Sequence, residues 1–174
     1  MTHLKRYNLL LIITLTFCSI AFGQARDTTT NDKKNIYDVP QQKGNVNDYE
    51  HLFSNEQTKY HNSLITNFEN RTTIKIAIVT IDTTMISKDN FDDFILQIIN
   101  NWGAGQKEKN NGVLIAISSG YRKIRIQNGS GIDKVLSNVQ TLELIEKFFV
   151  PGFEQGEMYN GTLKGLLELM EKLK

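Results

Sequence analysis

Oxygen-bearing side chains stand in the loops at the ends of the predicted strands. They are Asp48, Asn110, Asn111, Asp133 and Asn138. In an open α/β sheet, ligands bind in the loops outside the carboxyl ends of the strands. Carboxylate and amide oxygens are the ligands that calcium and magnesium prefer. The same residue types also gather in loops because they suit turn geometry, and spacing alone favours that explanation.

Other types of catalytic site find little support. His51 and His61 lie ten residues apart, not at the four-residue spacing of a helical zinc pair, so we expect both to be solvated surface residues. Asn128-Gly129-Ser130-Gly131 follows a predicted strand, but it lacks the lysine of a phosphate-binding loop and is expected to be a turn. The catalytic residues therefore stay unassigned.

The first 23 residues are typical of a signal peptide. Lys5 and Arg6 precede an apolar run, and Ala21-Phe22-Gly23 offers a cleavage site before Gln24. The run holds about 14 apolar residues, whereas a retained membrane anchor needs about 20. Cys18 could be lipidated instead, but bulky Phe17 precedes it. We expect cleavage and a periplasmic or secreted protein.

Cleavage would leave no cysteine, which excludes a thiol nucleophile and a cysteine-ligated metal. It would also remove two of the 20 basic residues, leaving 18 against 19 acidic ones and a formal charge of −1. Such a balance argues against nucleic acid as a partner. No second apolar span follows the leader. We expect a polar, flexible spacer over residues 24–43, with order beginning near Val46, and one domain over residues 44–174.

The positioning elements follow from apolar periodicity. Ser54 and Gln57 form a capping box for a helix that ends near Asn70. Strands are expected over 74–80, 113–117 and 123–127, the last two as a hairpin. A second helix is expected over 88–101, with Trp102 packed against the sheet. Further helices are expected near 132–136, over 141–149 with an end at Pro151, and over 159–173.

The first two of these strands flank a helix and should be parallel, with a right-handed crossover. The third should add antiparallel. The fold class is therefore α/β, with a small mixed, mostly parallel sheet and helices on both faces.

Short motifs in a fixed order resemble the TPM domain, named for a thylakoid lumen protein, a photosystem II repair protein and a nicotinic-receptor modulator. The motifs, which run in family order over about residues 40–173, are Gly44-Asn45-Val46-Asn47-Asp48-Tyr49, Trp102-Gly103-Ala104-Gly105, Asn111-Gly112-Val113-Leu114, Arg122-Lys123-Ile124-Arg125-Ile126, Gly129-Ser130-Gly131-Ile132, Val135-Leu136-Ser137-Asn138, Pro151-Gly152-Phe153 and Tyr159-Asn160-Gly161. The resemblance implies a three-layer α/β/α sandwich, export, and an acidic cleft for a divalent cation. It also implies either acid phosphatase activity or partnership with a membrane-protein complex.

Carried onto this chain, the cleft would use Asp48, Asn111, Asp133 and Asn138 as metal ligands. The family usually has Asp where this chain has Asn111 and Asn138, and a frequent Glu at Asp133. An amide offers an oxygen but no charge, so the resemblance implies only weak calcium or magnesium binding here.

Two hypotheses result. The first is an exported interaction module with a weak cation cleft, which would assist a membrane complex. The alternative is a metal-assisted acid phosphatase, with Arg122 or Arg125 positioning phosphate and Asp48 holding the metal or the water.

Overall fold

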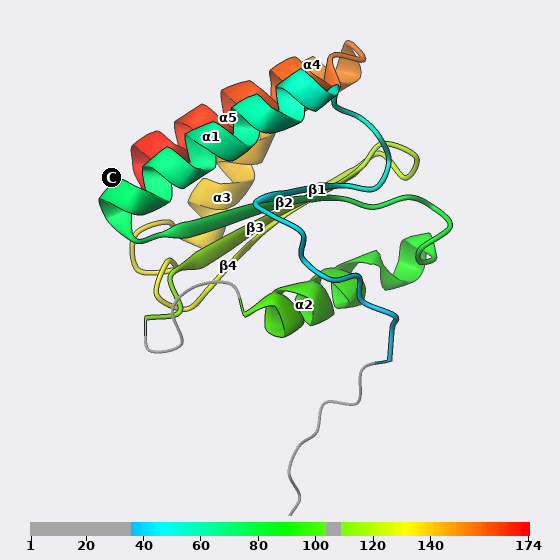
Figure 1. The fold of residues 1–174 in the computed structure, drawn as a ribbon, viewed down its shortest axis with the longest axis horizontal. Helices are drawn as coiled ribbons and strands as arrows, with labels where there is room; N and C mark the ends of the chain where they lie inside the picture. The colour runs from blue at the N-terminus through cyan, green and yellow to red at the C-terminus, as the bar shows by residue number, and fades with distance from the viewer. Residues whose placement is uncertain (1–35, 104–108) are drawn as a thin grey trace, which may run out of the picture. The chain divides into compact units, whose positions relative to one another are not determined.

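A four-stranded sheet lies at the centre of the part of the chain that the computed structural model describes, residues 36–103 and 109–174 (Figure 1). The strands, in sheet order, are β1 (Val46–Asp48), β2 (Lys75–Thr80), β3 (Gly112–Ser118) and β4 (Lys123–Asn128). The first three run parallel, and β4 runs antiparallel to β3. This arrangement confirms the mixed, mostly parallel sheet. The predicted signal peptide lies outside the described residues.

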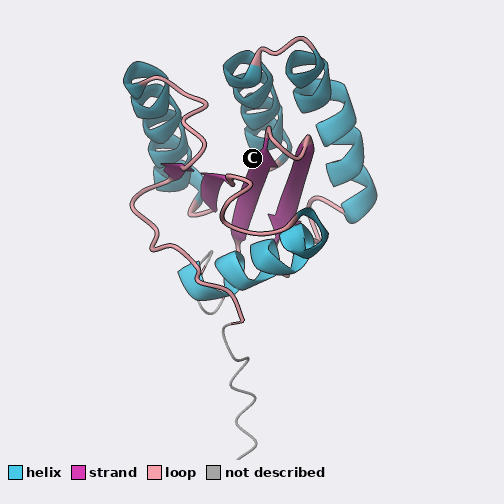
Figure 2. Cartoon of the chain, turned by 90° about the vertical axis from the view of Figure 1, so that its right-hand side faces the viewer, coloured by secondary structure: helices cyan, strands magenta, loops and turns pink. Residues whose placement is uncertain are grey.

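Helices cover both faces of the sheet, as Figures 1 and 2 show. They are α1 (Asn55–Thr72), η1 (Lys88–Asn90), α2 (Phe91–Trp102), α3 (Asn138–Leu144), η2 (Ile145–Phe149), α4 (Val150–Glu154) and α5 (Met158–Lys172). One buried cluster joins the sheet to α1, η2 and α5, and a second joins its other face to α2. The three-layer α/β/α sandwich is therefore confirmed. No helix among the described residues combines the length and apolar character that a membrane span requires.

The two parallel crossovers pass over opposite faces. The strands β1, β2 and β3 follow one another across the sheet, while α1 packs on one face and α2 on the other. Two such connections must have opposite hands, so only one of them can follow the right-handed rule. The strand β1 was not predicted, because three residues are too few to show alternation.

Local signals at the first helix were strong enough to place it. The Ser54 hydroxyl accepts a hydrogen bond from the Gln57 backbone N–H, and the Gln57 side chain accepts one from the Ser54 N–H at 2.8 Å. The predicted capping box is confirmed. The helix ends two residues later than expected, where Thr73 adopts a left-handed conformation with φ of 65°.

The third long helical segment differs from the prediction. It begins at Asn138 and does not end at Pro151, because a π-helical turn, η2, precedes α4. Val150 donates to the carbonyl of Ile145, five residues back. A widened turn reduces the demand for the backbone N–H that proline lacks, and Pro151 stands in the first turn of α4, where proline is tolerated. The short helix expected near 132–136 is a series of turns.

Order begins earlier than Val46. The Tyr37 ring stacks edge-on against Phe94 of α2 at 5.7 Å. The Trp102 indole N–H donates to the carbonyl of Pro40 at 2.7 Å, and its ring packs on the apolar cluster between α2 and the sheet. Residues 36–40, expected within the flexible spacer, therefore lie on α2, with Trp102 as their anchor. Lys43 is held instead by the Asn47 side chain, which accepts its backbone N–H at 2.8 Å.

His61 was predicted to be a solvated residue, and that prediction is wrong. Its side chain is fully buried between Phe53 and Tyr159, with ring centroids 5.2 and 5.1 Å away. Neither ring nitrogen has a hydrogen-bond partner among the described residues. Burial lowers the pKa of His61 to about 4, because the charged imidazolium would lose its solvation. His51, in contrast, is exposed as expected.

The buried histidine predicts a pH-dependent loss of stability. As pH falls below about 6.5, the unfolded chain binds a proton at this position, whereas the folded chain does so only near pH 4. Stability should be full above that window and fall by about 3 kcal/mol across it. Urea unfolding of the protein and of His61→Leu at several pH values measures this loss. An equal pH dependence in both proteins would contradict the prediction.

Candidate functional site

The four predicted metal ligands lie at two opposite ends of the sheet. Asp48 ends β1 and pairs with Thr80, whereas Asn111 immediately precedes Gly112, which pairs with Lys75. These two positions on β2 are five residues apart, or roughly 17 Å at about 3.3 Å per residue. A calcium ligand must lie about 2.3–2.6 Å from its ion. One ion coordinated by all four residues is therefore ruled out on geometry.

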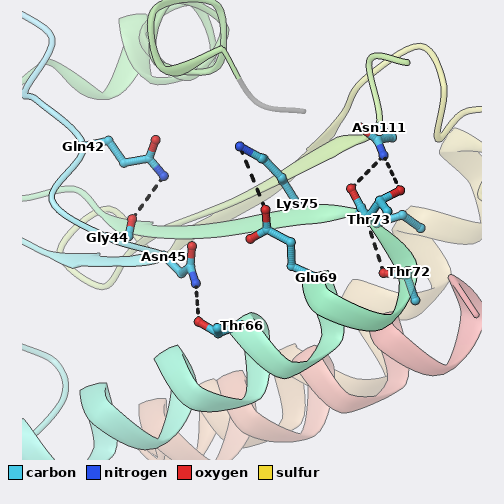
Figure 3. Close-up of polar contacts among 10 residues, drawn as sticks. Gln42, Gly44, Asn45, Thr66, Glu69, Thr72, Thr73, Lys75 and Asn111 are labelled. Atoms are coloured by element: carbon cyan, nitrogen blue, oxygen red, sulfur yellow. Dashed lines mark hydrogen bonds and ion pairs between the residues drawn. The ribbon is translucent and has the colours of Figure 1, made fainter. Parts of the chain in front are cut away.

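Asn111 serves the connection between α1 and β2 (Figure 3). Its side-chain N–H donates to the backbone carbonyl of Thr73 at 2.8 Å, and its backbone carbonyl accepts a hydrogen bond from the Lys75 N–H at 3.1 Å. The side chain is buried. The position needs a donor facing a carbonyl oxygen, which an amide supplies and a carboxylate cannot.

Asp133 and Asn138 lie near the same end of the sheet as Asn111, in the segment that follows β4, and both are exposed. The glycine-rich turn before them packs against backbone. A Cβ on Gly129 would lie 2.2 Å from the carbonyl oxygen of Asn110, and Gly131 donates to that same oxygen at 3.1 Å. Close approach of two chain segments accounts for these glycines, as expected for a turn.

Asp48, at the opposite end, accepts three hydrogen bonds. One of its carboxylate oxygens accepts from the Leu52 N–H at 3.0 Å and from the Thr80 hydroxyl at 2.7 Å. The other accepts from the Phe53 N–H at 2.9 Å. Asp48 thus closes the loop between β1 and α1.

A second carboxylate at this end was missed by the sequence analysis. Glu50 accepts hydrogen bonds from the N–H groups of Ser119 and Gly120 at 2.9 and 3.2 Å, and its own N–H donates to Thr80. It ties the β3–β4 hairpin to the loop after β1. Its partners are 69 and 70 residues away, so no spacing along the chain could have revealed it.

These carboxylates do not fit a resident divalent ion. Both oxygens of Asp48 are used by loop donors, and Glu50 is held by the hairpin. Among the residues that the structure describes, no three His, Cys, Asp or Glu side chains are grouped closely enough to hold a metal. An ion here would have to displace hydrogen bonds that stabilise the loops.

A groove of about 680 Å³ opens at the carboxyl end of β3, between the β3–β4 hairpin and α4. Its hairpin side includes Arg122 and Ile124, and its helical side includes Val150, Phe153, Glu154 and Met158. The apolar members are partly buried against the core. Parallel α/β sheets characteristically bind ligands at this end.

The two arginines considered for phosphate differ in their surroundings. Arg125 donates to Asp92 at 2.8 Å and to Gln127, and its hydrogen bond holds the pKa of Asp92 below its usual value. Arg122 is exposed, and its guanidinium forms no hydrogen bond or ion pair with a described residue. The same holds for the Glu154 carboxylate across the groove. Of the two arginines, Arg122 alone is available to a ligand.

The environment of Asn111 gives a prediction. Asn111→Asp should remove the donor to Thr73 and place a carboxylate against its carbonyl, so the free energy of unfolding should fall by about 1–3 kcal/mol. Asn138→Asp is the control, since this exposed first residue of α3 should change stability by at most about 0.5 kcal/mol. Urea unfolding with and without millimolar calcium measures both variants. If calcium restored the free energy of unfolding of the Asn111→Asp variant, the role of Asn111 as a donor to Thr73 would be contradicted.

Comparisons with known proteins agree with the motifs. The family model described as TPM domain matches residues 46–172. The N-terminal domain of a protein from P. gingivalis superposes with a TM-score of 0.67 at 26% identity, over 74% of this chain and 80% of that one. The protein BA42 from Bizionia argentinensis superposes with a TM-score of 0.61 at 22% identity, over 72% of this chain and 83% of that one. The N-terminal domain of the cg2496 protein from Corynebacterium glutamicum superposes with a TM-score of 0.57 at 16% identity, over 79% of this chain and 84% of that one. No curated protein matches the chain.

Proposed function

The chain belongs to the TPM domain family, and on that premise we propose that it is an exported interaction module that binds its partner in the groove at the carboxyl end of β3. The groove carries the proposal. Its volume lies within the range of about 300–1,000 Å³ typical of binding sites. It combines an apolar wall with two charged side chains, Arg122 and Glu154, which form no hydrogen bond or ion pair with a described residue. Such a surface offers both apolar burial and orientation to a ligand.

Export is the second part of the proposal. The basic start, the apolar run and Ala21-Phe22-Gly23 support processing before Gln24 and a periplasmic or secreted location. A complex in the adjoining membrane is the class of partner that we propose for such a protein. Mass spectrometry of the exported product should find Gln24 at the N-terminus, and a lipidated Cys18 there would overturn this part.

Calcium or magnesium has a minor place in the proposal. Because loop N–H groups already occupy Asp48, any association with a divalent cation should be weak, at millimolar concentrations or above.

One observation favours the alternative, a phosphatase: the exposed Arg122 guanidinium has no partner among the described residues. To hold a metal ion or the attacking water, Asp48 would have to leave its backbone donors. Hydrolysis of p-nitrophenyl phosphate with calcium or magnesium should therefore be the same for the protein and for Asp48→Asn. Turnover that is lost in this variant would support the phosphatase instead.

The groove itself can be tested with 8-anilinonaphthalene-1-sulfonate, which joins apolar rings to one negative charge. We expect the changes in protein NMR chemical shifts that it causes to centre on Ile124, Phe153 and Met158. Met158→Gln should weaken binding about fivefold, since it removes about 1 kcal/mol of apolar contact. Leu142→Gln, at an exposed position of α3, is the matched control and should leave affinity unchanged. Shifts centred on α3 would contradict the groove as the binding surface.

A further inference from the structure

The strand β4 is an open edge of the sheet. It pairs with β3 on one side and is the last strand in the sheet order. Apart from Asn128, whose carbonyl accepts the Gln127 side chain, no backbone group of β4 hydrogen-bonds with a described residue outside β3. An edge with unpaired N–H and C=O groups is a template for one more strand.

The charges that would normally guard such an edge are held on one face. Lys123 and Arg125 both bind Asp92 of α2, at 3.6 and 2.8 Å. The hydrogen bond from Arg125 lowers the pKa of Asp92 below its usual value. Both cations therefore lie over the α2 face instead of reaching across the edge. The other face of β4 carries Ile124 and Ile126, which pack against the opposite cluster.

The groove adjoins this apolar face of β4. An added strand would lie about 4.8 Å from β4, with alternate side chains on the same side as Ile124. Those side chains would meet Val150, Phe153 and Met158, which form the helical wall of the groove. Arg122, just before β4, would meet an acidic side chain at that end of the segment.

We propose that β4 receives an extended segment of a partner protein, which adds as a fifth strand, places alternate apolar side chains in the groove and sets an acidic side chain beside Arg122. Backbone hydrogen bonds would supply affinity and the groove would supply selectivity, as in other cases of strand addition. This inference rests on the proposed function, because it specifies what kind of partner the groove accepts.

The test uses the exported protein, purified after processing, and a short synthetic peptide that alternates valine and threonine and carries aspartate at one end. A matched peptide has the same side chains but N-methyl groups on alternate amides, which removes the donors. The first peptide should shift the NMR signals of both β4 and the groove. It should also slow hydrogen exchange at the outward amides of β4 at least about tenfold, since they become hydrogen-bonded. The methylated peptide should do neither.

A charge exchange tests the acidic end. Arg122→Glu should weaken binding of the aspartate peptide about fivefold. A peptide with lysine in place of aspartate should bind this variant with the affinity that was lost. Tyr60→Gln, at a half-exposed position of α1 outside the groove, is the control and should not change affinity.

The outcomes separate the two proposals. If both peptides bind equally, with shifts in the groove and no added protection of β4, strand addition is wrong while the groove remains the binding surface. If neither peptide nor the naphthalene sulfonate perturbs the groove, the inference and the proposed function both fail.

Discussion

Every residue of β3 is buried, and its two faces feed two different apolar clusters. Val113, Ile115 and Ile117 join the cluster with α1 and α5, while Leu114 and Ala116 join the cluster with α2. A strand that is apolar on both faces must be covered on both, and the two crossover helices supply that cover. The opposite hands of the crossovers follow, since α1 and α2 must lie on opposite faces although the strands follow one another in order. The rest of the fold is arranged around this double burial.

The two ends of the sheet present different backbone groups that need hydrogen-bond partners. At the carboxyl end, the loop after β1 and the β3–β4 hairpin present N–H groups, which Asp48 and Glu50 accept. At the amino end, the C-terminus of α1 presents the carbonyl of Thr73, which needs the donor that Asn111 supplies. A buried polar group without a hydrogen-bond partner costs free energy. The backbone group that needs a partner at each end therefore explains why acceptor carboxylates lie at one end and a donor amide at the other. The carbonyl of Thr73 thus accounts for the amide at Asn111.

The proposed function relies on side chains and backbone groups that have no role in stabilising the fold. Asp48, Glu50 and Arg125 are engaged in stabilising loops and faces of the sheet. Arg122, Glu154, the apolar wall beside them and the open edge of β4 are the features near one another that the described part of the fold leaves without a partner. Together they are the features on which the proposed recognition of a partner rests.

The sequence by itself determined the elements. Apolar periodicity located β2, β3, β4, α1, α5 and the helical segment formed by η1 and α2 to within about two residues, because local spacing indicates which face of an element is buried. The Ser54–Gln57 capping box and the order of family motifs were equally local. Tertiary structure alone decided that Asp48 and Asn111 lie at opposite ends of the sheet, that Glu50 reaches the hairpin, and that His61 is buried. Those facts depend on which residues of separate strands, loops and helices meet across many residues of chain, and the spacing within one element does not specify such pairings.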